Sequence, residues 1–105
     1  MPYSIYATKT FEKELDKLSS SDMEAVKKIF LQLKENPLVG DAIRYRFFRE
    51  KRIREKRIYY LVYEDLSSVL MVAIGGKKAQ PETINEIVRF IPEFKIYMKK
   101  LLGCD

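Results

Sequence analysis

The chain has 105 residues, 47% hydrophobic and 33% charged, with a net charge of +5. This length and balance predict one folded domain over residues 1–105. Histidine is absent and Cys104 is the only cysteine, which excludes imidazole chemistry, an internal disulfide and a cysteine-based zinc site. We therefore expect no metal and no small-molecule cofactor. No apolar run reaches the roughly 18 residues of a membrane span, and the N-terminus lacks a signal pattern, so the sequence predicts a cytoplasmic protein without a membrane partner.

The first third of the chain predicts one strand and two helices. Residues 3–7 alternate as a short strand does, and Thr8 or Thr10 can cap the helix that follows. Three serines at 19–21 interrupt this helix, and Ser21 with Glu24 has capping-box spacing for a second one. Asn36-Pro37 should end it. Apolar residues at helical spacing predict a helical hairpin packed on a sheet: Phe11, Leu15, Leu18, Met23, Val26, Ile29, Phe30 and Leu33.

The most unusual stretch runs from residue 43 to 64. Its residues alternate with period two and are rich in Tyr, Ile, Val and Phe, which predicts two antiparallel strands with a turn near Arg54-Glu55-Lys56. Between Arg44 and Arg57 eight cations face only two glutamates, a local net charge of +6, so the rest of the chain carries −1. The cations are Arg44, Arg46, Arg49, Lys51, Arg52, Arg54, Lys56 and Arg57.

Two interpretations of this basic hairpin are open. In the first it is a solvated surface whose arginine stems cover apolar neighbours. In the second it follows the phosphates of a nucleic acid. We favour the second, because a passive surface usually mixes both signs of charge.

The last third of the chain predicts a buried strand and two further helices. Residues 68–74 are apolar after Ser68, which is typical of a central strand, and Gly75-Gly76-Lys77-Lys78 ends it. Pro81 suits the first turn of a helix, Pro92 should break it, and Gly103 should cap the last helix. The predicted order is β-α-α-β-β-β-α-α, an α+β fold with a helical extension at about 81–102.

This order and its residues resemble the RelE/ParE superfamily of toxins from type II toxin–antitoxin systems. Arg52-Ile53-Arg54 is similar to the family's R-x-R strand, and residues 57–62 are similar to the strand that follows it. Residues 72–78 resemble the family's apolar last strand, which ends in glycine and a basic residue. The resemblance implies a small twisted antiparallel sheet with a helical hairpin on one side. In RNA-cleaving members that sheet faces messenger RNA in the ribosomal A site, and an antitoxin neutralises the toxin; we expect an acidic amphipathic antitoxin segment here.

The resemblance also implies roles for individual residues. Arg57 matches the strand arginine that contacts the scissile phosphate, and Lys77 or Lys78 takes the place of the basic residue after the last strand. The preceding strand usually carries Lys or Arg where Lys51, Arg52 and Arg54 lie. One departure is that residues 79–83 contain no tyrosine or histidine, whereas RNA-cleaving members often carry one there as acid or base. A second is that the helices after residue 80 are longer than in many members.

Self-cleavage of RNA through its 2′-hydroxyl needs a base, stabilisation of phosphorane charge and a proton for the leaving oxygen. Arginine can stabilise the charge but cannot be the base, whereas a lysine with a depressed pKa could be. Glu50 and Glu55 are conceivable bases, although we expect them to neutralise neighbours, and Tyr59, Tyr60 and Tyr63 could act as bases, stack on RNA bases or simply pack. The predicted catalytic residues are Arg57, Lys77, Lys78, Arg54 and Lys51. The predicted RNA-binding residues are Arg44, Arg46, Arg49, Arg52, Lys56 and Tyr60.

The sequence thus predicts a toxin that cleaves ribosome-bound messenger RNA. Two alternatives remain open: a toxin that inhibits DNA gyrase by binding, as the ParE branch does, and a non-catalytic RNA-binding descendant of the fold. The arginine-rich strand and Lys77-Lys78 favour cleavage, and the missing late Tyr or His favours the gyrase alternative.

Overall fold

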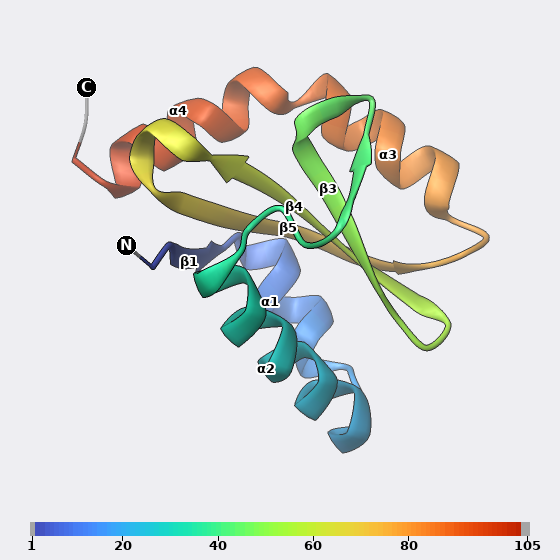
Figure 1. The fold of residues 1–105 in the computed structure, drawn as a ribbon. Helices are drawn as coiled ribbons and strands as arrows, with labels where there is room; N and C mark the ends of the chain where they lie inside the picture. The colour runs from blue at the N-terminus through green and yellow to red at the C-terminus, as the bar shows by residue number, and fades with distance from the viewer. Residues whose placement is uncertain (1, 104–105) are drawn as a thin grey trace.

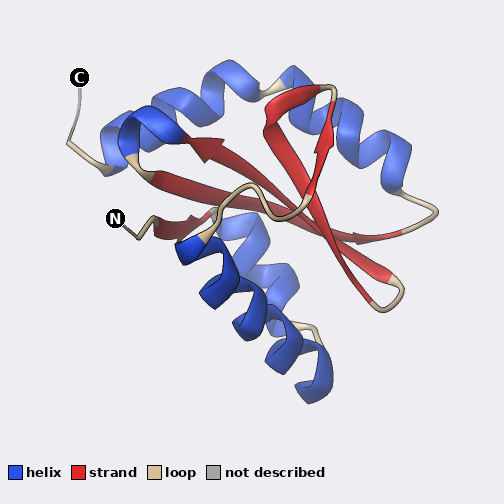
Figure 2. Cartoon of the chain, viewed as in Figure 1, coloured by secondary structure: helices blue, strands red, loops and turns tan. Residues whose placement is uncertain are grey.

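The computed structural model describes residues 2–103, which form a twisted five-stranded sheet with helices on both faces (Figure 1). In chain order the elements are β1 (Ser4–Ala7), α1 (Lys9–Asp16), α2 (Ser20–Glu35), β2 (Asp41–Ile43), β3 (Tyr45–Ile53), β4 (Lys56–Tyr63), β5 (Ser68–Gly76), α3 (Gln80–Arg89) and α4 (Ile91–Leu101), with a 3₁₀ turn at Glu64–Leu66. Figure 2 shows α1 and α2 below the sheet and α3 and α4 above it.

The strands lie in the order β1-β5-β4-β3-β2. Strands β2 to β5 pair antiparallel, and β1 pairs parallel with β5 at the edge. The predicted α+β fold is confirmed, with two refinements. The sheet is mixed, because β1 pairs parallel with β5. A short strand, β2, also precedes the hairpin, where the sequence predicted no strand.

Local signals set most element ends. The Thr8 hydroxyl accepts a hydrogen bond from the Phe11 N–H at 3.1 Å and caps α1. The cap of α2 is Ser19, whose hydroxyl accepts from the Asp22 N–H at 3.2 Å. The predicted cap at Ser21 is therefore wrong by two residues, because any of three consecutive serines has the required side chain and only Ser19 keeps the extended backbone of a cap.

Two hydrophobic cores fill the space on either side of the sheet. Alternate residues of β4 divide between them, as a pleated strand requires. The core under α1 and α2 contains Phe11, Val26, Ile29, Leu33, Ile53, Ile58, Tyr60, Val62, Val69, Met71 and Ile74. The core under α3 and α4 contains Phe48, Tyr59, Leu61, Tyr63, Leu70, Val72, Ile87 and Met98. Strand β5 is buried, as predicted, and lies between β1 and β4, whereas β4 is the middle strand of the sheet. No helix among residues 2–103 has the length and apolar character to cross a membrane.

The β3–β4 turn and the β5–α3 connection place the site described next. Arg54 lies at the turn, where the sequence predicted it. Its backbone is left-handed, with φ of 53°, although the residue is not a glycine. The adjacent strand ends are in register, since Arg52 pairs with Arg57 and Arg57 with Gly75. The β5–α3 connection, residues 77–79, therefore begins beside the hairpin end.

Candidate nucleic-acid interface

A groove of about 570 Å³ lies between the β3–β4 turn and the β5–α3 connection. It contains five cationic side chains and one carboxylate, and the full lining is Arg52, Glu55, Lys56, Arg57, Gly76, Lys77, Lys78 and Ala79. We call it the cationic groove. Gly76 pairs with Lys56 across the sheet and carries no side chain, so the long side chains of the hairpin have room to approach Lys77 and Lys78. The structure thus brings together five of the predicted site residues from two separate parts of the sequence.

Arg57 is the most enclosed cation of the groove. Its Nε lies 3.8 Å from Glu50 Oε1, and the two side chains are only 11% and 18% exposed. The other Glu50 oxygen, Oε2, accepts a hydrogen bond from Gln80 Nε2 at 3.0 Å. Glu50 therefore connects Arg57 to the first residue of α3. Among residues 2–103, no further hydrogen-bond partner holds the Arg57 Nη atoms, so its outer donors remain available to an anion.

Tyr59 lies on the same face as this pair and is fully buried. Its hydroxyl has no hydrogen-bond partner among the described residues. Burial raises the pKa of Tyr59, and the charge of Glu50 raises it further while Arg57 lowers it. The phenol therefore stays protonated near neutral pH, which makes Tyr59 unsuitable as a base.

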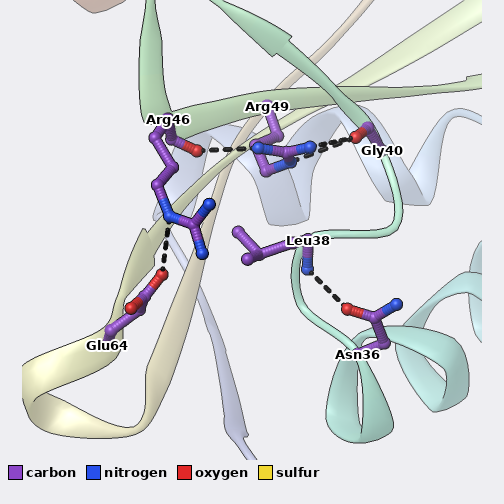
Figure 3. Close-up of polar contacts among 6 residues, drawn as sticks. All are labelled: Asn36, Leu38, Gly40, Arg46, Arg49 and Glu64. Carbon is purple, nitrogen blue, oxygen red and sulfur yellow. Dashed lines mark hydrogen bonds and ion pairs between the residues drawn. The ribbon is translucent and has the colours of Figure 1, made fainter.

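Three predicted RNA-binding arginines lie outside the cationic groove. Arg49 Nε and Nη2 donate to the Gly40 carbonyl at 3.0 and 2.7 Å, so this side chain fixes the loop before β2 (Figure 3). Arg46 Nε lies 3.3 Å from Glu64 Oε1 in an exposed ion pair. Arg44 donates from Nη2 to Asn85 Oδ1 on α3 at 2.8 Å. The basic hairpin is therefore not one continuous patch of free cations.

The remaining predicted cations are divided between the two faces of the sheet. Arg54 Nη1 and Lys56 Nζ lie 3.7 and 4.0 Å from the Asp22 carboxylate on α2, and Lys56 also lines the groove. Lys51 pairs with Ile58, which belongs to the core under α1 and α2. Paired residues share a face of the sheet, so Lys51 lies on the face opposite to Tyr59 and its neighbours. Neither Lys51 nor Arg54 is part of the groove lining.

Tyr60 does not lie on an RNA-accessible surface. It is fully buried in the core under α1 and α2, and its hydroxyl accepts a hydrogen bond from the Gly40 N–H at 3.0 Å. The prediction that Tyr60 stacks on RNA does not fit this position, and packing, the alternative from sequence, does. The period-two pattern of β4 shows which residues share a face of the strand. It does not show which of the two faces packs against α1 and α2, so the burial of Tyr60 could not be predicted.

Gln80 is the residue of this site that the sequence did not suggest, and Glu50 was a conceivable base that we expected to neutralise neighbours. A signal for Glu50 was present, because Glu50 and Arg52 have the same parity on β3 and so share a face. No sequence signal placed Gln80, since its contact with Glu50 depends on how α3 packs. Among residues 2–103, no three His, Cys, Asp or Glu side chains are grouped so that they could hold a metal ion.

Comparison with known proteins gives structural matches only. No protein-family model and no curated protein sequence matches the chain. A mutant of Escherichia coli RelE in the free state superposes with a TM-score of 0.69 at 21% identity, covering 83% of this chain and 99% of that one. The RelBE2 toxin–antitoxin complex from Mycobacterium tuberculosis gives 0.64 at 23% identity, covering 73% and 100%. The archaeal RelE–RelB complex from Pyrococcus horikoshii gives 0.63 at 16%, covering 73% and 97%. The chain thus has the fold of the RelE toxins, as its β-strand motifs led us to expect.

Proposed function

We propose that this protein is the toxin of a toxin–antitoxin module and cleaves messenger RNA on the ribosome. The observation that carries the proposal is the cationic groove, in which Arg57 is held by Glu50 beside Lys77 and Lys78. Five cations around one concave site suit a phosphodiester, whose charge increases in the transition state. The RelE fold of the chain also supports this proposed function.

The groove residues, together with Glu50, which is paired with Arg57 but does not itself line the groove, supply the groups that RNA cleavage needs. Glu50 is the carboxylate nearest the enclosed arginine, so we assign it the base that takes the proton from the 2′-hydroxyl. The 2′-oxygen then attacks phosphorus, and Arg57 stabilises the phosphorane charge through its free donors. The 5′-oxygen leaves with a proton from Lys77 or Lys78, giving a 2′,3′-cyclic phosphate and a free 5′-hydroxyl. Arg52 and Lys56 hold neighbouring phosphates.

An antitoxin is the proposed protein partner, as RelB is in the complexes with RelE. A second groove at the β1 edge, of about 530 Å³, offers it an apolar surface lined by Ile5, Tyr6, Ala7, Glu12, Phe30, Lys34, Met71, Tyr97 and Leu101. Tyr97 and Leu101 on α4 are 39% and 47% exposed. Lys99 and Lys100 lie beside them in the sequence, and this combination suits an acidic amphipathic segment.

Primer extension on messenger RNA after induced expression tests the function. The wild type should produce cuts in phase with ribosomes, and Arg57→Ala should abolish them. Arg89→Ala, which removes an exposed cation at the far end of α3, is the matched control and should cut as the wild type does. DNA damage with intact messages would instead support gyrase inhibition, and growth without either effect would support a non-catalytic protein.

A further inference from the structure

The Tyr59 hydroxyl is a buried polar group that the folded chain leaves unused. The side chain is fully buried in the core under α3 and α4, and its ring lies against that of Phe48, with centroids 6.4 Å apart. Among residues 2–103 the hydroxyl has no hydrogen-bond partner. Such a group costs stability, and native proteins retain few of them. Phenylalanine would supply the same ring without that cost, so the hydroxyl indicates a partner in another state of the protein.

The Glu50 carboxylate is the acceptor that the strand register places beside this hydroxyl. Glu50 and Tyr59 are directly paired across β3 and β4, so their side chains lie next to each other on one face of the sheet. The charges of Glu50 and Arg57 both act on the pKa of Tyr59. The phenol therefore lies within electrostatic range of the Glu50–Arg57 ion pair.

Only one oxygen of the Glu50 carboxylate is fixed by a hydrogen bond. Oε2 accepts from Gln80 Nε2 at 3.0 Å. Oε1 lies 3.8 Å from Arg57 Nε, which is longer than a hydrogen bond, so the charge of Arg57 attracts this oxygen without fixing its direction. Gln80 can therefore keep Oε2 in place while Oε1 changes its partner.

Small residues of β5 leave room for this change on the same face of the sheet. Tyr59 pairs with Ala73, and Arg57 pairs with Gly75. A Cβ added at Gly75 would have only Thr83 Oγ1 within 4 Å, at 3.8 Å. The side chains of β5 thus do not fill the space beside the ion pair.

We propose that Glu50 exchanges Arg57 for Tyr59 when a phosphate binds in the cationic groove, and that Tyr59 is the positioning residue that then holds the carboxylate. A phosphate bound to Arg57 takes over its charge and repels the Glu50 carboxylate. A mostly enclosed carboxylate that loses its counter-ion needs another donor, and the protonated phenol is one. In cleavage, which rests on the proposed function, the exchange frees Arg57 for the phosphorane and keeps Glu50 ionised as the base. The exchange itself requires only an anion.

NMR of the full chain, labelled with ¹³C at the Cζ atom of tyrosine, tests the exchange. Cζ carries the hydroxyl and reports whether it is hydrogen-bonded, and Tyr59→Phe identifies the Tyr59 signal. Saturating inorganic phosphate or a short RNA should shift this signal in the wild type. In Glu50→Gln the shift should be absent, because a phosphate does not repel an uncharged amide.

Single-turnover cleavage tests the positioning role. Tyr59→Phe should bind RNA as the wild type does and cleave about 10- to 100-fold more slowly, the value of one hydrogen bond to a charged group. Its stability in urea should equal or exceed that of the wild type, because the lost hydroxyl has no partner in this structure. Tyr63→Phe is the matched control: it removes a hydroxyl from the same core and should cleave at the wild-type rate.

The results separate this inference from the proposed function. A Tyr59 signal that neither phosphate nor RNA shifts, or that shifts equally in Glu50→Gln, would overturn the exchange. Tyr59→Phe that cleaves as fast as Tyr63→Phe would overturn the positioning role. A Glu50-dependent shift in a protein that cleaves no message would support the exchange and overturn the nuclease function.

Discussion

Replacing Glu50 with glutamine should make the protein less stable, yet let it bind RNA more tightly. The Arg57–Glu50 separation of 3.8 Å corresponds to an attraction of about 4 kcal/mol at an effective dielectric constant near 20. Desolvation of both groups offsets part of it, so we expect Glu50→Gln to lower the unfolding free energy by about 1–3 kcal/mol. The loss arises because the mostly enclosed Arg57 keeps its charge without a counter-ion.

The same change removes the carboxylate that competes with phosphate for Arg57. RNA affinity should therefore rise, whereas cleavage should fall by about 10²–10⁴ if Glu50 is the base. Urea unfolding, fluorescence anisotropy with a short RNA and single-turnover cleavage measure the three effects. Glu55→Gln is the matched control, because Glu55 lines the groove but is exposed and has no ion pair with Arg57. If Glu50→Gln matched Glu55→Gln in stability, affinity and cleavage, the role given to the pair would be refuted.

Three further predictions address other parts of the structure. Gly40→Ala should cost about 2 kcal/mol or more in urea unfolding, because a Cβ there would collide with the Glu50 carbonyl oxygen and lie 2.6 Å from the Tyr60 hydroxyl; wild-type stability would contradict this. Burial raises the pKa of Glu14 above 4.5, so the folded state keeps this proton to a higher pH, and the unfolding free energy should fall as the pH rises from 4.5 through the raised pKa. Glu14→Gln should show a smaller decline, and an equal decline would remove Glu14 as its cause. Lys77→Ala should flatten the dependence of log RNA affinity on log salt by about one unit, whereas Arg49→Ala should lower stability and leave the slope unchanged, since Arg49 is bonded to Gly40.

Much of the fold could be predicted because its signals are local. Thr8, Asn36 and Pro92 mark element boundaries through backbone chemistry that does not depend on tertiary contacts. The parallel direction of β1 and the short strand β2 depend on pairing between distant segments. The serine run shows a limit of local signals, since three equivalent caps were available and the structure uses Ser19.

The site could be predicted only in part. The charge of the hairpin and the Gly-Gly-Lys-Lys sequence identified the residues that line the cationic groove. Charge counting could not show that Arg49 is bonded to a carbonyl inside the loop or that Arg46 is paired with Glu64. The hydrogen bond between Arg44 and Asn85 could not be predicted from the sequence, because the two residues meet only through the packing of α3 beside the hairpin.

Single-turnover cleavage of ribosome-bound messenger RNA by the purified protein tests the central claim most directly. Arg57→Lys keeps the positive charge but loses the guanidinium fork, so the variant should bind RNA nearly as the wild type does and cleave about 10²–10³-fold more slowly. Arg57→Ala should lose both cleavage and part of the affinity. Cleavage by Arg57→Ala at the wild-type rate would contradict the account, because the cationic groove would then lack the residue on which its chemistry depends.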